Sequence, residues 1–293
     1  MDKPLQQRLT LHLETLACRD PDRRRAALEQ VLAAEGLAFT LQEEEPSVKL
    51  PRGIRNYLVE PGEAASSRPA LLLCAHYDAA FGSLGVNDNA ASLCILVTLA
   101  KALAGEGAAV KFAFFDGEES GFSGSRLYVS RMDKQTLAGV INLDMCGYGD
   151  SLVICGRGHE KSALFRPFCR KAFLEPFSGQ VVRFLPKGDE SSFARTRIPV
   201  LSMAMVPRWD ISYLKALATY GEGFLGRPPE FHMMLGQMEV VTTMHGGFRD
   251  GLEWIQPEAM ETVYWYLEAV VHGLENGQAG KRSSCFPGLL HTL

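Results

Sequence analysis

Six polar side chains in this sequence are of the types that bind metal ions or move protons. Five of them follow closely after short apolar runs, and an apolar run in a soluble domain is usually a buried strand. Desolvating a carboxylate or an imidazole there is costly unless the group is paired or bound to a metal. Nitrogen and oxygen ligands without a thiolate pattern favour zinc or a similar divalent ion. The six residues are His76, Asp88, Glu118, Glu119, Asp144 and His245.

The segment LLLCAHYD, Leu71–Asp78, combines an apolar run with a histidine and an aspartate. Because side chains alternate along a strand, His76 and Asp78 are predicted to point to the same face. An aspartate placed there accepts the second ring N–H of the histidine, which fixes the tautomer and raises its basicity. The alternative is an ordinary histidine at a strand end beside a solvated Asp78.

The loop GVNDNAAS, Gly85–Ser92, leads into an apolar helix. Its position just after the strand of His76 favours Asp88 as a carboxylate shared by two metals, with one oxygen for each. The alternative is that Asp88 or Asn89 simply caps the helix.

The most specific pattern is FFDGEESG, Phe114–Gly121, where an apolar run ends in three acids. Adjacent Glu118 and Glu119 would repel each other if both were buried, and a cation resolves that repulsion. Since neighbouring side chains diverge, we predict that Glu119 is a metal ligand and Glu118 the general base. A solvated acidic turn is the alternative, and Asp116 is interpreted as a structural helix cap.

Two further segments carry weaker patterns. NLDM ends an apolar run in Asp144, but many strands end in an aspartate. TMHGGFRD places His245 before two glycines, and a single histidine is usually structural.

The elements that must position these residues alternate between strands and helices. Strands are predicted at Asn56–Glu60, from Ala70 onward, and at Lys111–Phe115, Val140–Leu143, Ser151–Cys155, Gln180–Phe184 and Pro199–Val206. Helices are predicted at Leu5–Leu16, Arg23–Glu35, Ala90–Leu103, Ser123–Met132, Lys161–Phe173 and Pro257–Leu274. This alternation predicts an α/β fold with a largely parallel sheet and helices on both faces.

Composition narrows the function further. The chain has 293 residues, 46% of them hydrophobic, and a net charge of -4, which gives no electrostatic reason to expect nucleic acid or a membrane surface. The densest basic stretch, Arg19–Arg25, contains two aspartates and is interpreted as a solvated helix face. No signal peptide and no run of about 20 apolar residues is evident. Seven cysteines without CxxC spacing fit a reducing cytoplasm, where we expect the protein to act.

The segment Pro207–Thr243 breaks the alternation and is rich in aromatic residues and methionine. It is predicted either to line or cap a pocket, as an insertion over residues 207–243, or to form a loop with its own small core. The tail from Gly280 to Leu293 is predicted to be loosely held.

Taken in order, HYD, NDNAAS, DGEESG, NLDM and a late histidine resemble peptidase family M28, the zinc aminopeptidases. The resemblance runs from about Tyr57 to Leu274 and implies one domain over residues 1–279. The implied fold is a three-layer α/β/α arrangement with a mixed, mostly parallel sheet and two metal ions at the carboxyl ends of its strands. It also implies that Asp88 bridges two metals, that Glu119 and His245 complete one site and His76 and Asp144 the other, with Glu118 as base and Asp78 orienting the first histidine.

Two departures from the family pattern stand out. In GDESSF, Gly188–Phe193, Glu190 occupies a position where relatives often have a histidine, so the pocket wall is expected to differ. The Thr-Pro-x-Asp continuation common after the late histidine is missing, and Asp250 arrives later.

The resemblance implies hydrolysis of N-terminal residues from peptides, or of small amides, by a metal-activated water and a glutamate base. Glutaminyl cyclases, with one zinc, share the resemblance and are the nearest alternative. A metal-free scaffold that binds partners is a second alternative, and a carboxypeptidase or deacylase is a third.

Overall fold

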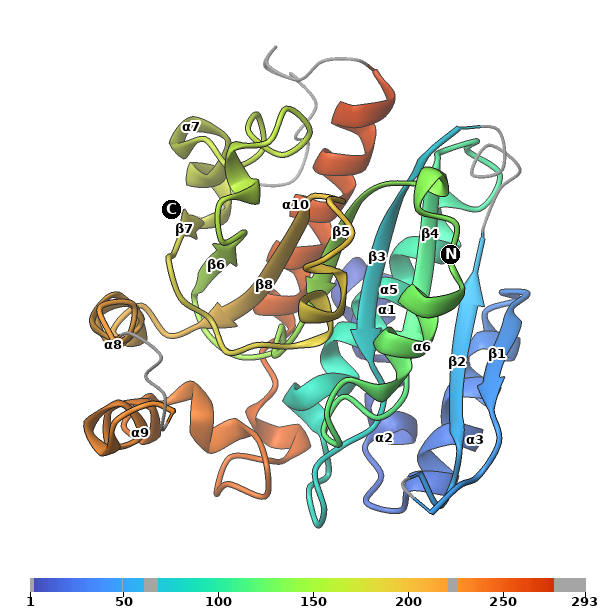
Figure 1. Ribbon diagram of the computed structural model, residues 1–293, viewed down its shortest axis with the longest axis horizontal. Helices are drawn as coiled ribbons and strands as arrows, with labels where there is room; N and C mark the ends of the chain where they lie inside the picture. Colours follow the sequence, from blue (N-terminus) through green and yellow to red (C-terminus); the bar gives the residue numbers. More distant parts are fainter. Residues whose placement is uncertain (1–2, 49, 61–67, 221–225, 277–293) are drawn as a thin grey trace.

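The computed structural model describes residues 3–48, 50–60, 68–220 and 226–276, and a mixed eight-stranded sheet lies at its centre (Figure 1). The sheet order is β1-β2-β4-β3-β5-β8-β6-β7. Its central strands β4, β3, β5 and β8 are parallel, while β1, β2 and β6 run antiparallel to their inner neighbours. The strands are β1 Thr40–Glu44, β2 Ile54–Val59, β3 Ala70–His76, β4 Val110–Phe115, β5 Leu137–Leu143, β6 Ser151–Cys155, β7 Gln180–Val181 and β8 Val200–Val206.

Helices cover both faces of the sheet, which confirms the predicted α/β class. Figure 1 shows α6 in front of the sheet and α1, α5 and α10 behind it, where these three pack against one another. The helices are α1 Leu5–Thr10, α2 Leu13–Leu16, α3 Pro21–Ala34, α5 Ala91–Leu103, α6 Ser123–Arg131, α7 Lys171–Leu174, α8 Asp210–Leu217, α9 Pro229–Gly236 and α10 Pro257–Glu275, with the short helices η1 Val86–Ala90, η5 Asp189–Phe193 and η6 Val240–Thr243.

The apolar residues of β3 before His76 pack on both faces of the sheet. Leu71 and Leu73 join the core on the side of α5, whereas Leu72 and Cys74 join the core on the side of α6. All seven residues of the strand are buried, as expected for a parallel strand covered on both faces. The strand therefore delivers its last residue, His76, to the carboxyl edge of the sheet in a fixed orientation.

The helix predicted at Lys161–Phe173 is wrong. The segment forms a series of turns, and only α7 is α-helical. Pro167 in its middle has no N–H to donate, which removes one helical hydrogen bond. The strand predicted at Gln180–Phe184 is shorter, because only Gln180 and Val181 pair with β6. Strand β1 was not predicted, since its mostly exposed sequence TLQEE lacks an apolar alternation.

The solvated helix face predicted for Arg19–Arg25 is also wrong in part. Arg24 is 1% exposed and donates to the carbonyl oxygens of Leu16, Leu84 and Gly85, each at 2.8 Å. The φ of Gly85 is 58°, and a Cβ there would lie 2.8 Å from the Nη1 atom of Arg24. Helix α3 is thereby tied to the loop that leads from β3 toward Asp88.

The segment 207–243 forms α8, α9 and η6. Leu214, Leu217 and Phe231 pack with Val153 of β6 and Val206 of β8, so the segment shares an apolar core with the sheet. The core is therefore shared with the sheet and is not the segment's own, as one interpretation expected, while the pocket-lining interpretation stays a prediction. The predicted tail from Gly280 lies outside the described residues.

One stretch of the described chain, Val86–Leu103, is long and apolar enough to cross a membrane by length and composition, with a mean hydropathy of 1.2. In this fold it comprises η1 and α5, and 89% of it is buried inside the protein. Its apolar character is accounted for by its position in the core.

Candidate metal centre

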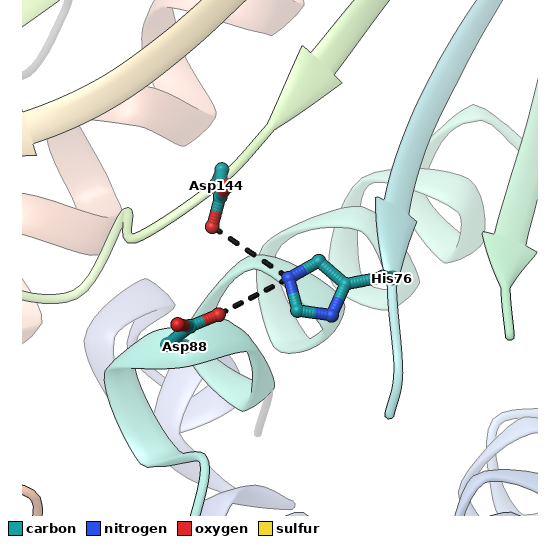
Figure 2. A group of neighbouring side chains, drawn as sticks. All are labelled: His76, Asp88 and Asp144. Carbon is teal, nitrogen blue, oxygen red and sulfur yellow. Dashed lines mark ion pairs between the residues drawn. The ribbon is translucent and has the colours of Figure 1, made fainter. Parts of the chain in front are cut away.

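Three of the predicted ligands meet at the carboxyl ends of β3 and β5 (Figure 2). His76 ends β3, Asp144 follows β5, and Asp88 lies in η1 between β3 and α5. The Nε2 atom of His76 lies 3.1 Å from Oδ1 of Asp88 and 3.7 Å from Oδ1 of Asp144. Figure 2 shows this ring nitrogen pointing between the two carboxylates.

A second group shares Asp88 with the first. The other oxygen of Asp88, Oδ2, lies 3.3 Å from Nε2 of His245, and this nitrogen lies 3.2 Å from Oε2 of Glu119. In each group of three the potential ligand atoms lie within 4.8 Å of one another. The structure thus brings all five predicted ligands together, with one oxygen of Asp88 facing each histidine.

The geometry fits metal ions. Two ligands on a tetrahedral zinc are separated by about 3.4 Å when each bond is about 2.1 Å, and the four distances above scatter around that value. Oε1 of Glu119 and Oδ1 of Asp144 are buried and accept no hydrogen bond from the residues that the structure describes. Buried carboxylate oxygens are costly without a partner, and a cation would supply one.

The asparagines on either side of Asp88 hold it in place. Nδ2 of Asn87 donates to Oγ1 of Thr243 at 2.7 Å, and Nδ2 of Asn89 donates to the carbonyl of Leu143 at 2.9 Å. Neither Asp88 nor Asn89 caps α5, whose N-cap has no side-chain hydrogen bond, so the capping alternative is wrong. The NDN motif joins the end of β5 to the segment that precedes His245.

Asp78 organises both the first histidine and the acidic turn. Nδ1 of His76 lies 3.1 Å from the carbonyl oxygen of Asp78 and 3.4 Å from its Oδ1. The carboxylate of Asp78 also accepts the backbone N–H groups of Glu118 at 3.0 Å and Glu119 at 3.1 Å. Nδ1 of His76 therefore faces both the carbonyl and the carboxylate of Asp78, and the predicted orienting role of this carboxylate stays a prediction. The same carboxylate also fixes the turn that carries Glu118 and Glu119.

The electrostatics of the turn favour a proton on Glu118 in the absence of metal. Burial raises the pKa of Glu118 to about 9, and the carboxylates of Asp144, Asp189 and Asp88 add to the shift while His76 opposes it. Asp116, at the start of the turn, does not cap a helix as interpreted from sequence. Its carboxylate accepts hydrogen bonds from Nη2 of Arg25 at 2.6 Å and from the backbone N–H of Arg55 at 3.1 Å.

The pKa shifts of His245, Asp88 and Asp144 show how strongly the two histidines and the acids interact. Hydrogen bonds to Asp88 and Glu119 raise the pKa of His245 to about 10. Burial alone would raise the pKa of Asp88, but the hydrogen bonds from His245 and His76 outweigh it and hold the pKa below its usual range. Burial raises the pKa of Asp144 to about 6, although the nearby imidazole of His76 opposes the shift.

The loop of His245 is held by Asp250. His245 is half-exposed and has a φ of 53°, in the left-handed region. Oδ2 of Asp250 accepts hydrogen bonds from the backbone N–H of Gly246 at 2.9 Å, from Oγ of Ser83 at 2.6 Å and from the N–H of Leu84 at 3.2 Å. Sequence analysis noted only the late position of Asp250, whereas the structure shows that it ties the His245 loop to the loop after β3.

Glu190 is a buried acid near the candidate metal centre. It is 3% exposed and accepts hydrogen bonds from Nη1 of Arg157 at 3.1 Å and Nδ2 of Asn142 at 3.4 Å. Its neighbour Asp189 is fully buried, and burial raises the pKa of Asp189 to about 7. No role was predicted for Arg157, which stands in no recognisable pattern, or for Asn142, which begins the NLDM motif.

Comparisons with known proteins find relatives of this chain in sequence and in fold. Leucine aminopeptidase 2 of Trichophyton rubrum is 31% identical over 144 residues, which cover 44% of this chain and 29% of that protein, so the match spans less than a third of the relative's length. A glutaminyl cyclase from Porphyromonas gingivalis superposes with a TM-score of 0.64 at 16% identity, covering 92% of this chain and 97% of the other. A zinc aminopeptidase from Bacillus subtilis gives a TM-score of 0.57 at 18% identity, with 76% and 50% covered.

The two solved structures show a shared fold. The sequence model of peptidase family M28 matches residues 56–239, which is more than half of the chain. This range contains His76, Asp88, Glu119 and Asp144, whereas His245 lies just beyond it. On these grounds the chain belongs to peptidase family M28.

Proposed function

We propose that this chain is a two-zinc aminopeptidase that removes N-terminal residues from peptides. The observation that carries the proposal is the position of Asp88, which turns one carboxylate oxygen toward His76 and the other toward His245. A carboxylate placed between two ligand groups is suited to bridge two cations. Asp144 would complete the first zinc site and Glu119 the second.

Bound zinc ions would supply Lewis acidity and lower the pKa of a water molecule. Their charge would also lower the pKa of Glu118, so that its carboxylate is ionised near neutral pH. Glu118 would then take the proton from the attacking water and pass it to the nitrogen of the leaving amine. Asp78 would hold Glu118 in position through the backbone N–H that it accepts.

The experiment that tests the proposal combines metal analysis with turnover of a leucyl anilide. We expect two zinc ions per chain and measurable hydrolysis. Replacing Glu118 with Gln should retain both metals and lower kcat on the order of 10³-fold. The exposed Glu258→Gln variant makes the same chemical change on α10, outside the turn and the ligand set, and should keep full activity. Full activity of Glu118→Gln would remove Glu118 from the role of base.

Glutaminyl cyclase is the second candidate, because the chain covers nearly the whole of a glutaminyl cyclase structure. The same samples distinguish the two activities. A cyclase would convert an N-terminal glutaminyl peptide and bind one zinc per chain, whereas the proposed aminopeptidase would bind two and release leucine. Purified protein without bound zinc and unable to bind it would instead point to a scaffold.

A further inference from the structure

A hollow of about 330 Å³ lies beside the metal centre. Its lining includes Asp78 and Glu119 from the centre itself, Leu50 and Arg52 from the segment that leads into β2, and Phe81 from the loop after β3. A volume of this size lies at the lower end of the range for small-ligand pockets, roughly 300–1,000 Å³, which is room for about two amino-acid residues. Glu119 belongs both to the lining of the hollow and to the proposed metal centre, so the two lie next to each other.

The hollow offers an apolar surface that the fold leaves exposed. The side chain of Phe81 is fully exposed, although it is a large aromatic residue in the loop that directly follows His76 and Asp78. Leu50 and Pro51 add apolar lining beside it. Exposed apolar groups beside a polar centre are typical of ligand-binding surfaces.

Arg52 supplies a positive charge that the fold does not use. The neighbouring Arg25 pairs with Asp116 at 2.6 Å, and Arg55 pairs with Glu43 at 2.7 Å. Arg52 makes no ion pair with any residue in the described part of the chain.

The three acids in the lining, Asp78, Asp116 and Glu119, already have partners, and Asp116 accepts a hydrogen bond from Nη2 of Arg25 at 2.6 Å. Asp78 accepts two backbone N–H groups, and Glu119 lies 3.2 Å from His245. The guanidinium of Arg52 is therefore the charged group in the hollow that is left for an anionic ligand, and a carboxylate matches its geometry.

We propose that this hollow binds the part of a short peptide that lies beyond the scissile bond, and that Arg52 pairs with the C-terminal carboxylate of that peptide. The inference rests on the proposed aminopeptidase function and narrows its substrates to peptides of about two or three residues with a free C-terminus. A peptide whose first residue lies at the metals would extend past Glu119 into the hollow, with its carboxylate toward Arg52.

The test compares the tripeptide Leu-Gly-Gly with its C-terminal amide. Binding is measured by calorimetry with the zinc-loaded Glu118→Gln protein, so that the readout does not require turnover. We expect the free acid to bind at least about tenfold more tightly than the amide, as a charge-assisted pair contributes. Adding Arg52→Ala should bring the ratio of the two dissociation constants, amide over free acid, close to one. Arg52→Lys should keep part of this ratio.

The exposed Arg126→Ala variant removes the same charge outside the lining and should keep the full ratio. Equal binding of acid and amide, or a ratio that survives Arg52→Ala, would overturn the inference, and so would the absence of peptide binding. The proposed function is tested separately by turnover of the leucyl anilide. If the protein hydrolyses the anilide but binds the free acid and the amide equally, the aminopeptidase proposal stands and the proposal about Arg52 is wrong.

Discussion

The two halves of the candidate metal centre have similar ligands but very different support. The strand site consists of His76, Asp88 and Asp144, and the loop site of Asp88, Glu119 and His245. The side chain of His76 is 1% exposed, whereas that of His245 is 50% exposed. The chemistry of a ligand set therefore does not determine how firmly the protein holds it.

The difference follows from the elements behind each site. His76 ends a strand that is buried along its whole length, so its orientation is set by the sheet. His245 lies in an irregular loop in the left-handed region, where Asp250 supplies the hydrogen bonds that fix the chain. We expect the strand site to bind zinc more tightly, because less ordering is needed when the metal enters.

The largest effect should come from the residue that both sites share. Asp88→Ala removes one ligand atom from each group of three, so both sites are expected to lose zinc and activity should fall to background. Zinc per chain and hydrolysis of a leucyl anilide measure this. The exposed Asp22→Ala variant makes the same change on α3 and should bind two zinc ions. Two tightly bound zinc ions in Asp88→Ala would show that Asp88 does not bridge.

Removing one histidine at a time should separate the two sites. His245→Ala is expected to fold normally and keep about one zinc per chain. His76→Ala removes the imidazole that Oδ1 of Asp88 and Oδ1 of Asp144 both face, so it should also destabilise the metal-free protein, by about 1–3 kcal/mol. Metal analysis gives the zinc content of each variant, and thermal unfolding in the presence of a chelator gives the stability of the metal-free protein. Equal loss of stability in the two variants would contradict the contrast between strand and loop.

The same contrast explains what could be predicted from the sequence. The strand ligands are visible because a buried strand leaves an apolar run and the polar residue after it stands out, as in His76 and Asp144. The fold class follows from the same runs. The loop ligand His245 has no such run before it, and only its place in the order of family motifs identified it.

The supporting residues were harder to predict, because their partners are distant in the chain. Ser83 and Asp250 are 167 residues apart, and Asn87 and Thr243 are 156 apart. Arg24 is buried while the adjacent Arg23 is exposed, and nothing in a run of three arginines distinguishes them. Such contacts depend on tertiary packing, which local propensity and periodicity do not contain.

A smaller effect should follow from loosening the loop without removing a ligand. Asp250→Ala removes the acceptor that holds Gly246 and Ser83, so we expect the zinc affinity of the loop site to fall about 10- to 100-fold. A zinc titration should show the weaker phase moving while the tighter phase stays. Ser83→Ala removes one of these hydrogen bonds and should give a smaller shift. An unchanged weaker phase in Asp250→Ala would mean that the loop holds His245 without it.

The last comparison is a pH dependence that should differ between metal-free and zinc-loaded protein. The pKa of His245 is raised from 6.5 to about 10 without metal, so its pairing with the carboxylates stabilises the fold fully below pH 6.5 and is lost as the pH rises toward 10. Glu118 acts in the same direction, because its pKa rises from 4.5 to about 9 and the unfolded chain ionises first.

The Tm of the metal-free protein should therefore fall between pH 6 and pH 9. Zinc requires the neutral imidazole, so its apparent affinity should rise over that window by at most about tenfold per pH unit for each proton displaced. The gap in Tm between zinc-loaded and chelated protein should widen accordingly, and His245→Ala should reduce the widening. If the difference in Tm narrows as the pH rises, zinc does not displace a proton from the loop site. His245 would then not be a zinc ligand.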